Sequence, residues 1–275
     1  MDTLVRLGIQ AQAYIPDVIA RSLTKKVCPR IGNSRSTTLK RSFVDKYKIN
    51  LRMTRKCAKA DTIDDCIAKF DTVNDLFARK ILAKYTRPDT TRATAIVSPA
   101  ECEARIEPAT NRFTIKEAQY SLAELLDKPN PKVPQQATVY IFRLEPQHYH
   151  RFHSPIASKI TNIHSAGNNY ASVHPLLLDK LPVLQTNYRK ILTFENGMYL
   201  VIIGATCVGS IELDVKKGDT VKHGQDLGAF KFGGSCVVLV VPHKITAVKT
   251  TLGKKERPLR VGKYIADFEP MPRTS

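Results

Sequence analysis

The feature that most constrains the fold of this chain is a change of residue pattern near residue 90. Before it, apolar residues recur at spacings of three and four, which is typical of helices that bury one face. Over residues 61–81 one helical face is formed by Ile63, Cys66, Ile67, Phe70, Val73, Leu76, Phe77 and Ile81. Asp61 or Thr62 is the candidate cap. The segment 26–37 is rich in Ser with Pro, Gly and Asn, and we expect it to form a loop.

After residue 90 the pattern changes to short runs of β-branched and aromatic residues between turns. The runs are TAIVSP, ATVYIFRL, YLVIIGATCVGSIEL, GAFKF and SCVVLVVP. Such runs predict strands. The segment LDKPNPKVPQQ (126–136) holds three prolines and is expected to be a loop or linker. The sequence therefore predicts an α+β fold, in which a helical N-terminal region (1–85) packs on a β-rich body (86–275).

The charge of the chain points to a polyanionic partner. Its 43 Lys and Arg residues against 25 Asp and Glu residues give a formal net charge of +18. Nucleic acid and the anionic surface of a membrane both attract such a chain. No recognised nucleic-acid-binding motif accompanies the charge, so we expect no nucleic-acid partner. The basic, roughly amphipathic segment 14–26 is the candidate for contact with a membrane surface.

Neither the cysteines nor the apolar runs indicate a covalent framework or a membrane span. The six cysteines are scattered without a C-x-x-C pair, and we expect them to be reduced and mostly buried. No run approaches the roughly 18 apolar residues that a spanning helix needs. The first residues lack the continuous apolar core of a secretory signal, which leaves a transit peptide, a surface-lying helix or a plain N-terminal helix as the alternatives.

Two short segments carry residues suited to chemistry. The segment HYHRFHSP places His148, His150 and His153 within six residues, shortly after a predicted strand. Imidazole is suited to proton transfer near neutral pH, whereas no H-E-x-x-H pattern supports a metal site. The segment FGGSC (232–236) fits neither the G-x-S-x-G hydrolase pattern nor a phosphate-binding loop. Taken alone, it predicts a turn between strands.

These segments belong to an ordered series over residues 40–242 that resembles the phosphatidylserine decarboxylases, most strongly the fungal and plant type. The series comprises FVDKYKINL, FDTVNDLFARKI, RPDTTRATAIVSPAE, FTIKEAQYSLAELL, IFRLEPQHYHRFHSPI, VIIGATCVGSIEL and KKGDTVKHGQDLGAFKFGGS. Each piece is short, but their order is specific. The resemblance implies a pyruvoyl-dependent enzyme that makes phosphatidylethanolamine.

The resemblance further implies that the chain cuts itself. Ser235 would attack the carbonyl of Gly234, and elimination would then break the chain. The products would be a β chain that ends at Gly234 and an α chain (235–275) that begins with a pyruvoyl group made from Ser235. The two chains would stay associated. Glycine at 234 suits this step because it leaves its carbonyl open and tolerates backbone strain.

The resemblance also implies roles for two histidines. His153, the second histidine of H-R-x-H, would take the proton of Ser235 during self-cleavage. His150, the first, would be associated with proton transfer in the decarboxylation. The pyruvoyl group would act as the electron sink when carbon dioxide leaves, so neither an external cofactor nor a metal is expected.

The chain departs from the family pattern at four positions. Glu101 stands where the family orients its histidine with an aspartate, and we expect Glu101, rather than Glu103, to take that role. His148 stands where aspartate is usual, Cys236 replaces serine or threonine, and Glu117 replaces a common glycine. These departures keep two alternatives open, a decarboxylase of a small free amino acid and a non-catalytic, unprocessed lipid-binding relative.

The function expected from the sequence is a self-processing decarboxylase that converts phosphatidylserine to phosphatidylethanolamine and carbon dioxide. The resemblance implies a lipoyl-carrier-like barrel-sandwich around residues 204–228 of the β-rich body. We expect a peripheral enzyme at an anionic phospholipid membrane surface, with phosphatidylserine as its substrate. A mitochondrial or endomembrane surface is expected, the cytoplasmic side stays open, and a homodimer is a further expectation.

Overall fold

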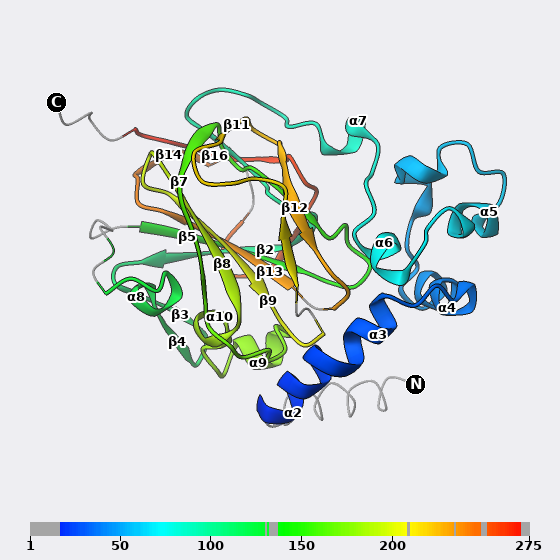
Figure 1. Cartoon of the computed structure of the whole chain (residues 1–275). Helices are drawn as coiled ribbons and strands as arrows, with labels where there is room; N and C mark the ends of the chain where they lie inside the picture. Colours follow the sequence, from blue (N-terminus) through cyan, green and yellow to red (C-terminus); the bar gives the residue numbers. More distant parts are fainter. Residues whose placement is uncertain are drawn as a thin grey trace.

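The structure, a computed structural model, describes residues 17–129, 131, 137–207, 210–233, 235–248 and 252–270. Short N-terminal helices lie along one side of a body built mainly from strands (Figure 1). The N-terminal helices end at Thr86 and the first strand begins at Ala95. The prediction of a mixed α+β fold is therefore confirmed. The first 16 residues and most of the predicted linker after residue 129 lie outside the described residues.

The N-terminal helices are short, and several begin at a residue whose side chain caps them. Ser36 Oγ accepts the backbone N–H of Leu39 at the start of α4, and Lys48 ends that helix in the left-handed conformation (φ 51°). The helical segments are α2 (Asp17–Ser22), the π-helical η1 (Leu23–Val27), α3 (Cys28–Gly32), α4 (Thr37–Tyr47), the 3₁₀ segments η2 (Leu51–Met53) and η3 (Arg55–Cys57), α5 (Ile63–Ala68), α6 (Val73–Phe77) and α7 (Ala83–Thr86). Helices of this length are marginal alone, so their order depends on what they pack against.

The helical face predicted for residues 61–81 is divided between two helices. Thr62 caps α5, as one of the two candidates, and forms a capping box with Asp65. Thr72 accepts the N–H of Asp75 and begins α6. Phe70 lies between the two helices and is still buried. The apolar spacing thus predicts the burial of this face except at Ile63, which is 52% exposed, and a second capping residue divides the helix.

The loop predicted for residues 26–37 is wrong over its first half. η1 and α3 continue the helical path to Gly32, and only residues 33–36 connect it to α4. Pro29 lies inside this helical path, directly after the π-helical turn η1, and it has no backbone N–H to donate. The proline therefore coincides with a change of helical hydrogen-bond pattern rather than with a loop.

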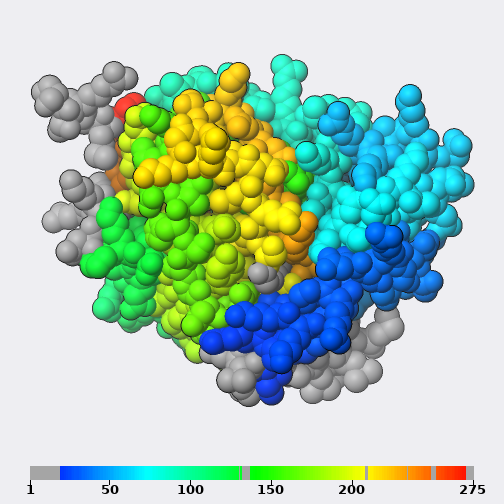
Figure 2. Space-filling model, in the orientation of Figure 1, coloured from blue at the N-terminus to red at the C-terminus, as the bar shows by residue number. Residues whose placement is uncertain are grey.

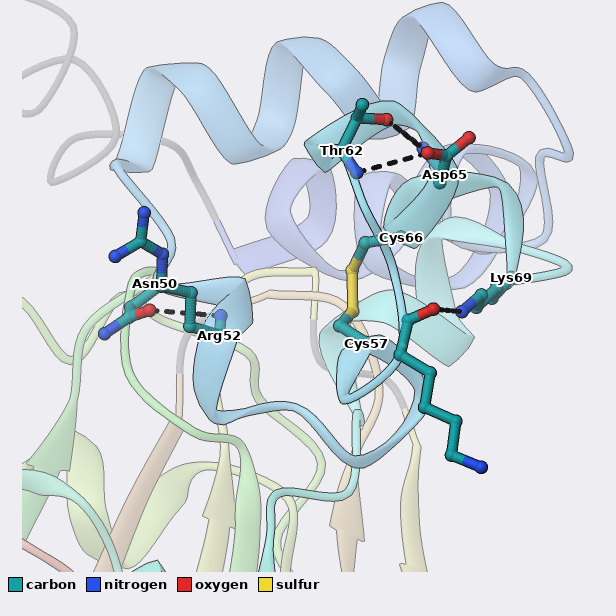
Figure 3. The surroundings of a disulfide bond; sticks show 8 residues. Asn50, Arg52, Cys57, Thr62, Asp65, Cys66 and Lys69 are labelled. Carbon is teal, nitrogen blue, oxygen red and sulfur yellow. Dashed lines mark hydrogen bonds between the residues drawn. A yellow bond between two sulfur atoms is a disulfide. The ribbon is translucent and has the colours of Figure 1, made fainter.

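The expectation that the six cysteines are reduced is wrong for four of them. Cys28 on α3 forms a disulfide with Cys207, which follows strand β9 (Tyr199–Gly204), and their Cα atoms lie 5.2 Å apart. Cys57 and Cys66 form a second disulfide that joins η3 to α5, with Cα atoms 4.9 Å apart (Figure 3). The other two cysteines are free and buried. The pairs are 179 and 9 residues apart in sequence, so only tertiary proximity identifies them.

An eight-stranded antiparallel sheet forms the centre of the body. Its strand order is β11-β7-β8-β9-β13-β5-β2-β15. Besides β9, its strands are β2 (Cys102–Ala109), β5 (Ala137–Leu144), β7 (Ser158–Ala166), β8 (Arg189–Phe194), β11 (Thr220–Val221), β13 (Ser235–Val241) and β15 (Arg257–Leu259). β13 pairs with β9 on one side and β5 on the other, and it is buried at every residue. Its continuous apolar run predicts such a two-sided burial.

Two three-stranded sheets and a hairpin complete the strand structure of the described residues. The sheets have the orders β10-β12-β6 and β1-β16-β14, and β3 pairs with β4. Their strands are β1 (Ala95–Val97), β3 (Arg112–Ile115), β4 (Ala118–Ser121), β6 (Arg151–His153), β10 (Ile211–Leu213), β12 (Asp226–Phe230), β14 (Ile245–Val248) and β16 (Tyr264–Phe268). The segment 204–230 therefore supplies strands to two different sheets.

Two apolar cores lie on opposite faces of the large sheet. One face is covered by the hairpin β3–β4 and by the helices α8 (Leu122–Leu125), α9 (Pro175–Leu178) and α10 (Val183–Thr186), which pack on Cys236 and Val238. The other face meets the N-terminal helices and the small sheets through residues such as Phe77 and Val237. Consecutive residues of β13 therefore face different cores.

The N-terminal helices flank the strands over a continuous stretch of surface. In the space-filling view, residues 17–86, in blue and cyan, lie against the green and yellow body (Figure 2). α6 reaches the start of β13, because Asn74 Oδ1 accepts the N–H of Phe232 at 2.9 Å. Across the described ranges, we find no helix with the length and apolar character needed to cross a bilayer.

Candidate active site

Ser235 is the first residue of β13 and is completely buried. Gly204 of β9 and Leu144 of β5 stand opposite Ser235 in the two flanking ladders. Gly234 lies outside the described residues. Gly233 has a φ of 139°, a conformation that residues with a side chain rarely adopt. The sheet thus holds the serine just after a glycine-dependent backbone turn.

His150 is the side chain that contacts Ser235. His150 Nδ1 lies 3.2 Å from Ser235 Oγ, and His150 Nε2 lies 3.0 Å from the carbonyl oxygen of Glu145. Because a carbonyl oxygen only accepts, Nε2 carries the proton and donates it to Glu145. Nδ1 of the neutral ring is then the nitrogen without a proton, and it accepts the hydroxyl hydrogen of Ser235. The Glu145 carbonyl therefore fixes the tautomer that aims a lone pair at the serine.

The surroundings of His150 keep its ring neutral. The side chain is completely buried, and burial lowers its pKa well below the ordinary value of 6.5. The nearby charges of Arg79 and His148 lower it further. A neutral imidazole is ready to accept a proton at neutral pH. A serine hydroxyl that is hydrogen-bonded to such a base can be activated as a nucleophile.

Two residues of α6 that the sequence analysis did not assign to the site form a wall of it. Phe77 stacks on the imidazole of His150, with ring centroids 3.8 Å apart and ring planes at 20°. Phe77 also meets the ring of Phe232 edge-on at 5.6 Å, and Asn74 holds the backbone of Phe232. The apolar spacing at Phe77 predicts core packing alone. Nothing local to Asn74 indicates that it binds a backbone 158 residues away.

His153 lies on β6 and has other partners than Ser235. Its Nδ1 lies 2.9 Å from the carbonyl oxygen of Gly224, and its Nε2 lies 3.0 Å from the hydroxyl of Tyr149. The Nδ1–H therefore donates to the carbonyl, and Nε2 accepts from Tyr149, whose pKa is raised by burial. Both ring nitrogens are occupied. The sequence-based role of His153 as the base for Ser235 does not match these contacts, whereas His150 has the required geometry.

The side chain of Glu101 contacts the histidine segment at a backbone N–H group. Its Oε2 accepts the N–H of Tyr149 at 2.9 Å, and within the described ranges it makes no hydrogen bond to His153. Because Tyr149 bonds to His153 through its hydroxyl, Glu101 and His153 share this neighbour instead of touching each other. His148 uses its Nδ1 to accept the N–H of Glu145, and burial lowers the pKa of His148. These contacts fix the turn that presents His150.

The remaining departures from the family pattern lie away from the serine hydroxyl. Cys236 packs in the core beneath the hairpin β3–β4, on the face of the sheet opposite that of Ser235. Glu117 is exposed in the turn between β3 and β4. Glu103, the less favoured substitute for the family aspartate, lies on β2 in register with Arg143 of β5. The hydrogen bonds described above for Ser235 and His150 involve none of these three residues.

Comparison with known proteins relates this chain to one protein family. Residues 73–267, more than half of the chain, match a family model described as phosphatidylserine decarboxylase. A Saccharomyces cerevisiae protein named phosphatidylserine decarboxylase proenzyme 2 is 32% identical over 234 residues, which cover 81% of this chain and 20% of that protein. A Komagataella phaffii protein of the same name is 36% identical over 199 residues, 66% of this chain and 20% of that protein.

Bacterial proteins match over most of their own length. A Bacillus mycoides phosphatidylserine decarboxylase proenzyme is 30% identical over 254 residues, which cover 88% of this chain and 91% of that protein. The chain therefore spans about a fifth of the length of the two yeast relatives and nearly all of this bacterial relative. The matched region contains α6, the histidine segment and the start of β13.

Proposed function

The chain belongs to the phosphatidylserine decarboxylase family, and we propose that it is a self-processing, pyruvoyl-dependent enzyme that converts phosphatidylserine to phosphatidylethanolamine and carbon dioxide. The observation that carries this proposal is the contact between the buried hydroxyl of Ser235 and the neutral ring of His150. Family membership supplies the reaction class. The geometry supplies the residues that could perform it.

In the first stage, Ser235 cuts the chain in front of itself. His150 accepts the hydroxyl proton at Nδ1 while Ser235 Oγ bonds to the carbonyl carbon of Gly234, so the amide becomes an ester. Removal of the α-proton of residue 235 and breakage of its Cβ–Oγ bond release Gly234 as a carboxylate. Water then adds to the remaining dehydroalanine and ammonia leaves. The α chain begins with the resulting pyruvoyl group.

The surroundings of residue 235 fit such a group. The position is completely buried, His150 is its hydrogen-bonding neighbour, and Phe77 covers one face of that imidazole. A pyruvoyl group supplies an electron sink for the bond that loses carbon dioxide. Beside it, His150 holds or releases a proton at Nδ1, and Phe77 keeps water from the ring. No other residue has to supply the electron sink.

The supporting residues act through Tyr149 in this proposal. Glu101 holds the backbone N–H of Tyr149, and His153 accepts its hydroxyl. Tyr149 directly precedes His150, so both contacts restrict the position of the base. We assign the base role in self-cleavage to His150 and positioning roles to His153 and Glu101.

The two chains made by cleavage are expected to stay together. β13 begins the α chain, and its hydrogen-bond ladders run to β9 on one side and β5 on the other, both of which belong to the β chain. Its side chains are buried on both faces of the sheet. Separation would expose this apolar strand to water at a large cost in free energy.

We propose that the first described helices rest on an anionic membrane surface. Residues 17–26 of the candidate segment expose Ile19, Lys25 and Lys26. The adjoining residues 27–31, which lie outside the segment, add the exposed side chains Val27, Arg30 and Ile31. Residues 14–16 of this segment lie outside the described residues. Each basic residue near an anionic surface contributes about 1 kcal/mol. The two disulfides favour a mitochondrial or endomembrane compartment with oxidised thiols over the cytoplasmic side.

We also propose a division into a helical region (1–85) and a catalytic domain (86–275), a lipoyl-carrier-like arrangement around residues 204–228, and a homodimer. Limited proteolysis of the folded protein tests the division near residue 85. Light scattering of the purified protein measures the number of chains in the particle.

The decisive experiment on the proposed function is the intact mass of the purified protein under denaturing conditions. Two chains divided between Gly234 and Ser235, the smaller with a pyruvoyl end, are expected. Release of carbon dioxide from phosphatidylserine vesicles, and not from free amino acids, is expected next. A single full-length chain after long incubation would contradict self-processing and favour the non-catalytic lipid-binding alternative. Activity on free amino acids without vesicles would favour the other alternative.

A further inference from the structure

A cavity of about 660 Å³ lies beside the candidate active site and is lined by an excess of basic residues. We call it the basic pocket. Its basic lining residues are Arg55, Lys56, Arg79, Lys80, Arg151 and Lys231, and its acidic ones are Asp75 and Glu212. Such an excess of positive charge attracts anions.

Carboxylates in the pocket and next to it pair with only half of these cations. Lys56 pairs with Asp75, Lys231 pairs with Glu212, and Arg151 pairs with Asp214 and Asp226. Within the ranges that the structure describes, the other three basic side chains have no carboxylate at salt-bridge distance, and these are Arg55, Arg79 and Lys80. Arg55 and Lys80 are exposed and adjacent, because the N–H of Arg55 donates to the carbonyl of Lys80 at 2.8 Å.

Arg79 is the unusual member of the set. Only 4% of its surface is exposed, and its Nη2 donates to the carbonyl oxygens of Gln147 and His148 at 3.2 and 3.3 Å. Its Nε and Nη1 are buried and have no hydrogen-bonding partner among the described residues. Burial lowers the pKa of the guanidinium to about 10, so the group stays charged at neutral pH. A buried charge with two unused donors is costly unless an anion or water meets them.

Arg79 connects the basic pocket to the candidate active site, both along the chain and through a hydrogen bond. Arg79 follows Phe77, which stacks on His150, by two residues. Through its Nη2, Arg79 also holds the carbonyl of His148, two residues before His150. A ligand held at Arg79 would therefore lie beside the segment that positions His150.

A second cavity extends the basic pocket toward the proposed membrane-contact helices. It has a volume of about 380 Å³ and shares four lining residues with the basic pocket, Asn33, Asn74, Glu212 and Lys231. Its other lining residues include Thr24, Lys25 and Cys28 of η1 and α3. The two cavities thus form a path between those helices and the basic pocket, which favours a ligand that arrives from a lipid surface.

We propose that the basic pocket binds a phosphate ester monoanion through Arg79, Arg55 and Lys80, and that this anion is the phosphodiester of the lipid headgroup. The inference rests on the proposed function and names the part of the substrate that the enzyme recognises. A substrate carboxylate is a poor occupant, because a cation on it would stabilise the group that must leave as neutral carbon dioxide. The pocket would then select phosphatidylserine over a free amino acid, which has no phosphate.

The test uses binding to a chain that cannot process itself. In a Ser235→Ala background, soluble glycerophospho-L-serine and inorganic phosphate are titrated by calorimetry. Saturable binding of glycerophospho-L-serine is expected, and Arg55→Gln with Lys80→Gln should weaken it at least tenfold. Both changed side chains are exposed, so the fold should be retained. The control is Arg52→Gln with Lys59→Gln, which removes two exposed charges outside the pocket and should leave binding unchanged.

A second variant examines the buried guanidinium. Arg79→Lys keeps the charge but loses the planar donor set, and it should also weaken binding about tenfold. Circular dichroism shows whether this variant folds. If it does not, the proposal is tested by comparing the exposed double variant with its control. Absence of saturable binding, or equal affinity of the pocket and control variants, would overturn the proposal. Equal affinity for inorganic phosphate and glycerophospho-L-serine would overturn the assignment to the lipid headgroup.

Failure of this inference and failure of the proposed function give different results. Self-cleavage is measured on chains that keep Ser235, by intact mass. A chain that cleaves and decarboxylates phosphatidylserine equally well with and without Arg55 and Lys80 would leave the proposed function standing and remove the phosphate subsite. The opposite result is binding of glycerophospho-L-serine by the Ser235→Ala chain without any cleavage of the chain that keeps Ser235. It would support the phosphate subsite and contradict the proposed self-processing.

Discussion

Strand β13 and helix α6 meet at the same candidate site, but different forces hold them there. β13 is hydrogen-bonded on both sides and buried on both faces, so its position follows from the eight-stranded sheet. α6 has five residues, about one and a half turns, which is too short to be stable alone. Its position depends on the Thr72 cap, the Asn74 contact with Phe232 and the packing of Phe77.

The nucleophile and two of the groups near it therefore come from parts of the molecule that are held in place in different ways. Ser235 belongs to the rigid strand, whereas Phe77 and Arg79 come from the N-terminal helical region. The Cys57–Cys66 disulfide lies within that region, near the capping residues Thr62 and Asp65 of α5 (Figure 3), and the Cys28–Cys207 disulfide joins the region to the body. We therefore expect changes in the helical region to loosen the site while leaving the serine in place.

The largest effect is expected from removing the base. His150→Ala should slow cleavage between Gly234 and Ser235 by about 10²–10⁴-fold, the usual contribution of a general base. The matched change His153→Ala should slow cleavage less, because His153 contacts Tyr149 and Gly224 rather than Ser235. Mass spectrometry of the full-length chain over time measures both rates. Slower cleavage in His153→Ala than in His150→Ala would return the base role to His153.

The next effect is on the stability of the helical region. In the chain-entropy model, the Cys28–Cys207 disulfide, whose cysteines are 179 positions apart in sequence, contributes about 5 kcal/mol, and the Cys57–Cys66 disulfide about 2.5 kcal/mol. Paired Cys→Ser changes should lower the free energy of unfolding in that order in urea. Hydrogen exchange should show lost protection in α2 and α3 with protection kept in β13. An equal loss in β13 would show that the two regions unfold together.

Acid should destabilise the histidine turn. Burial lowers the pKa of His148, His150 and His153 below 6.5, whereas the unfolded chain binds protons on these groups near 6.5. As the pH falls below about 6.5, the unfolded state gains protons that the folded state does not, so the free energy of unfolding decreases. The loss is up to about 1.4 kcal/mol per pH unit for each histidine, and it ends at the lowered pKa of the folded state.

The measurement is urea unfolding at several pH values above and below about 6.5. Above this value the contribution of the three histidines should be constant, since both states are then neutral at these groups. The same titration on His150→Phe should show a shallower decrease. A free energy of unfolding that does not change below about pH 6.5 would contradict the burial of neutral histidines.

The smallest effect on cleavage is expected at Cys236. Cys236→Ser restores the residue type that the family pattern favours, yet it faces the core beneath β3–β4 and not His150. Cleavage should change less than about threefold, which is below about 1 kcal/mol in the barrier. The folded state should lose about 1–3 kcal/mol if the buried hydroxyl finds no partner. A cleavage rate that changes by more than about tenfold would show that the two faces of β13 are coupled.

Local sequence determined those features whose physical cause is local. The continuous apolar run after Ser235 predicts a buried strand, because only a strand or helix buried on all sides tolerates such a run. Thr62 is identified as a cap because its side chain bonds to a backbone N–H three residues away. The ordered motifs give the family and bring Ser235 and the histidines into consideration. For these features, the residues that determine the structure are close to one another in the sequence.

Only the tertiary structure decided which partners meet. The preference for His150 over His153 at Ser235 depends on a contact across 85 residues and on the carbonyl of Glu145, which fixes the tautomer. The disulfide of Cys28 with Cys207, the wall supplied by Phe77 and the unused donors of Arg79 likewise arise where distant segments pack together. Sequence spacing carries no information on such contacts, because the packing of the whole chain sets the distance between two side chains.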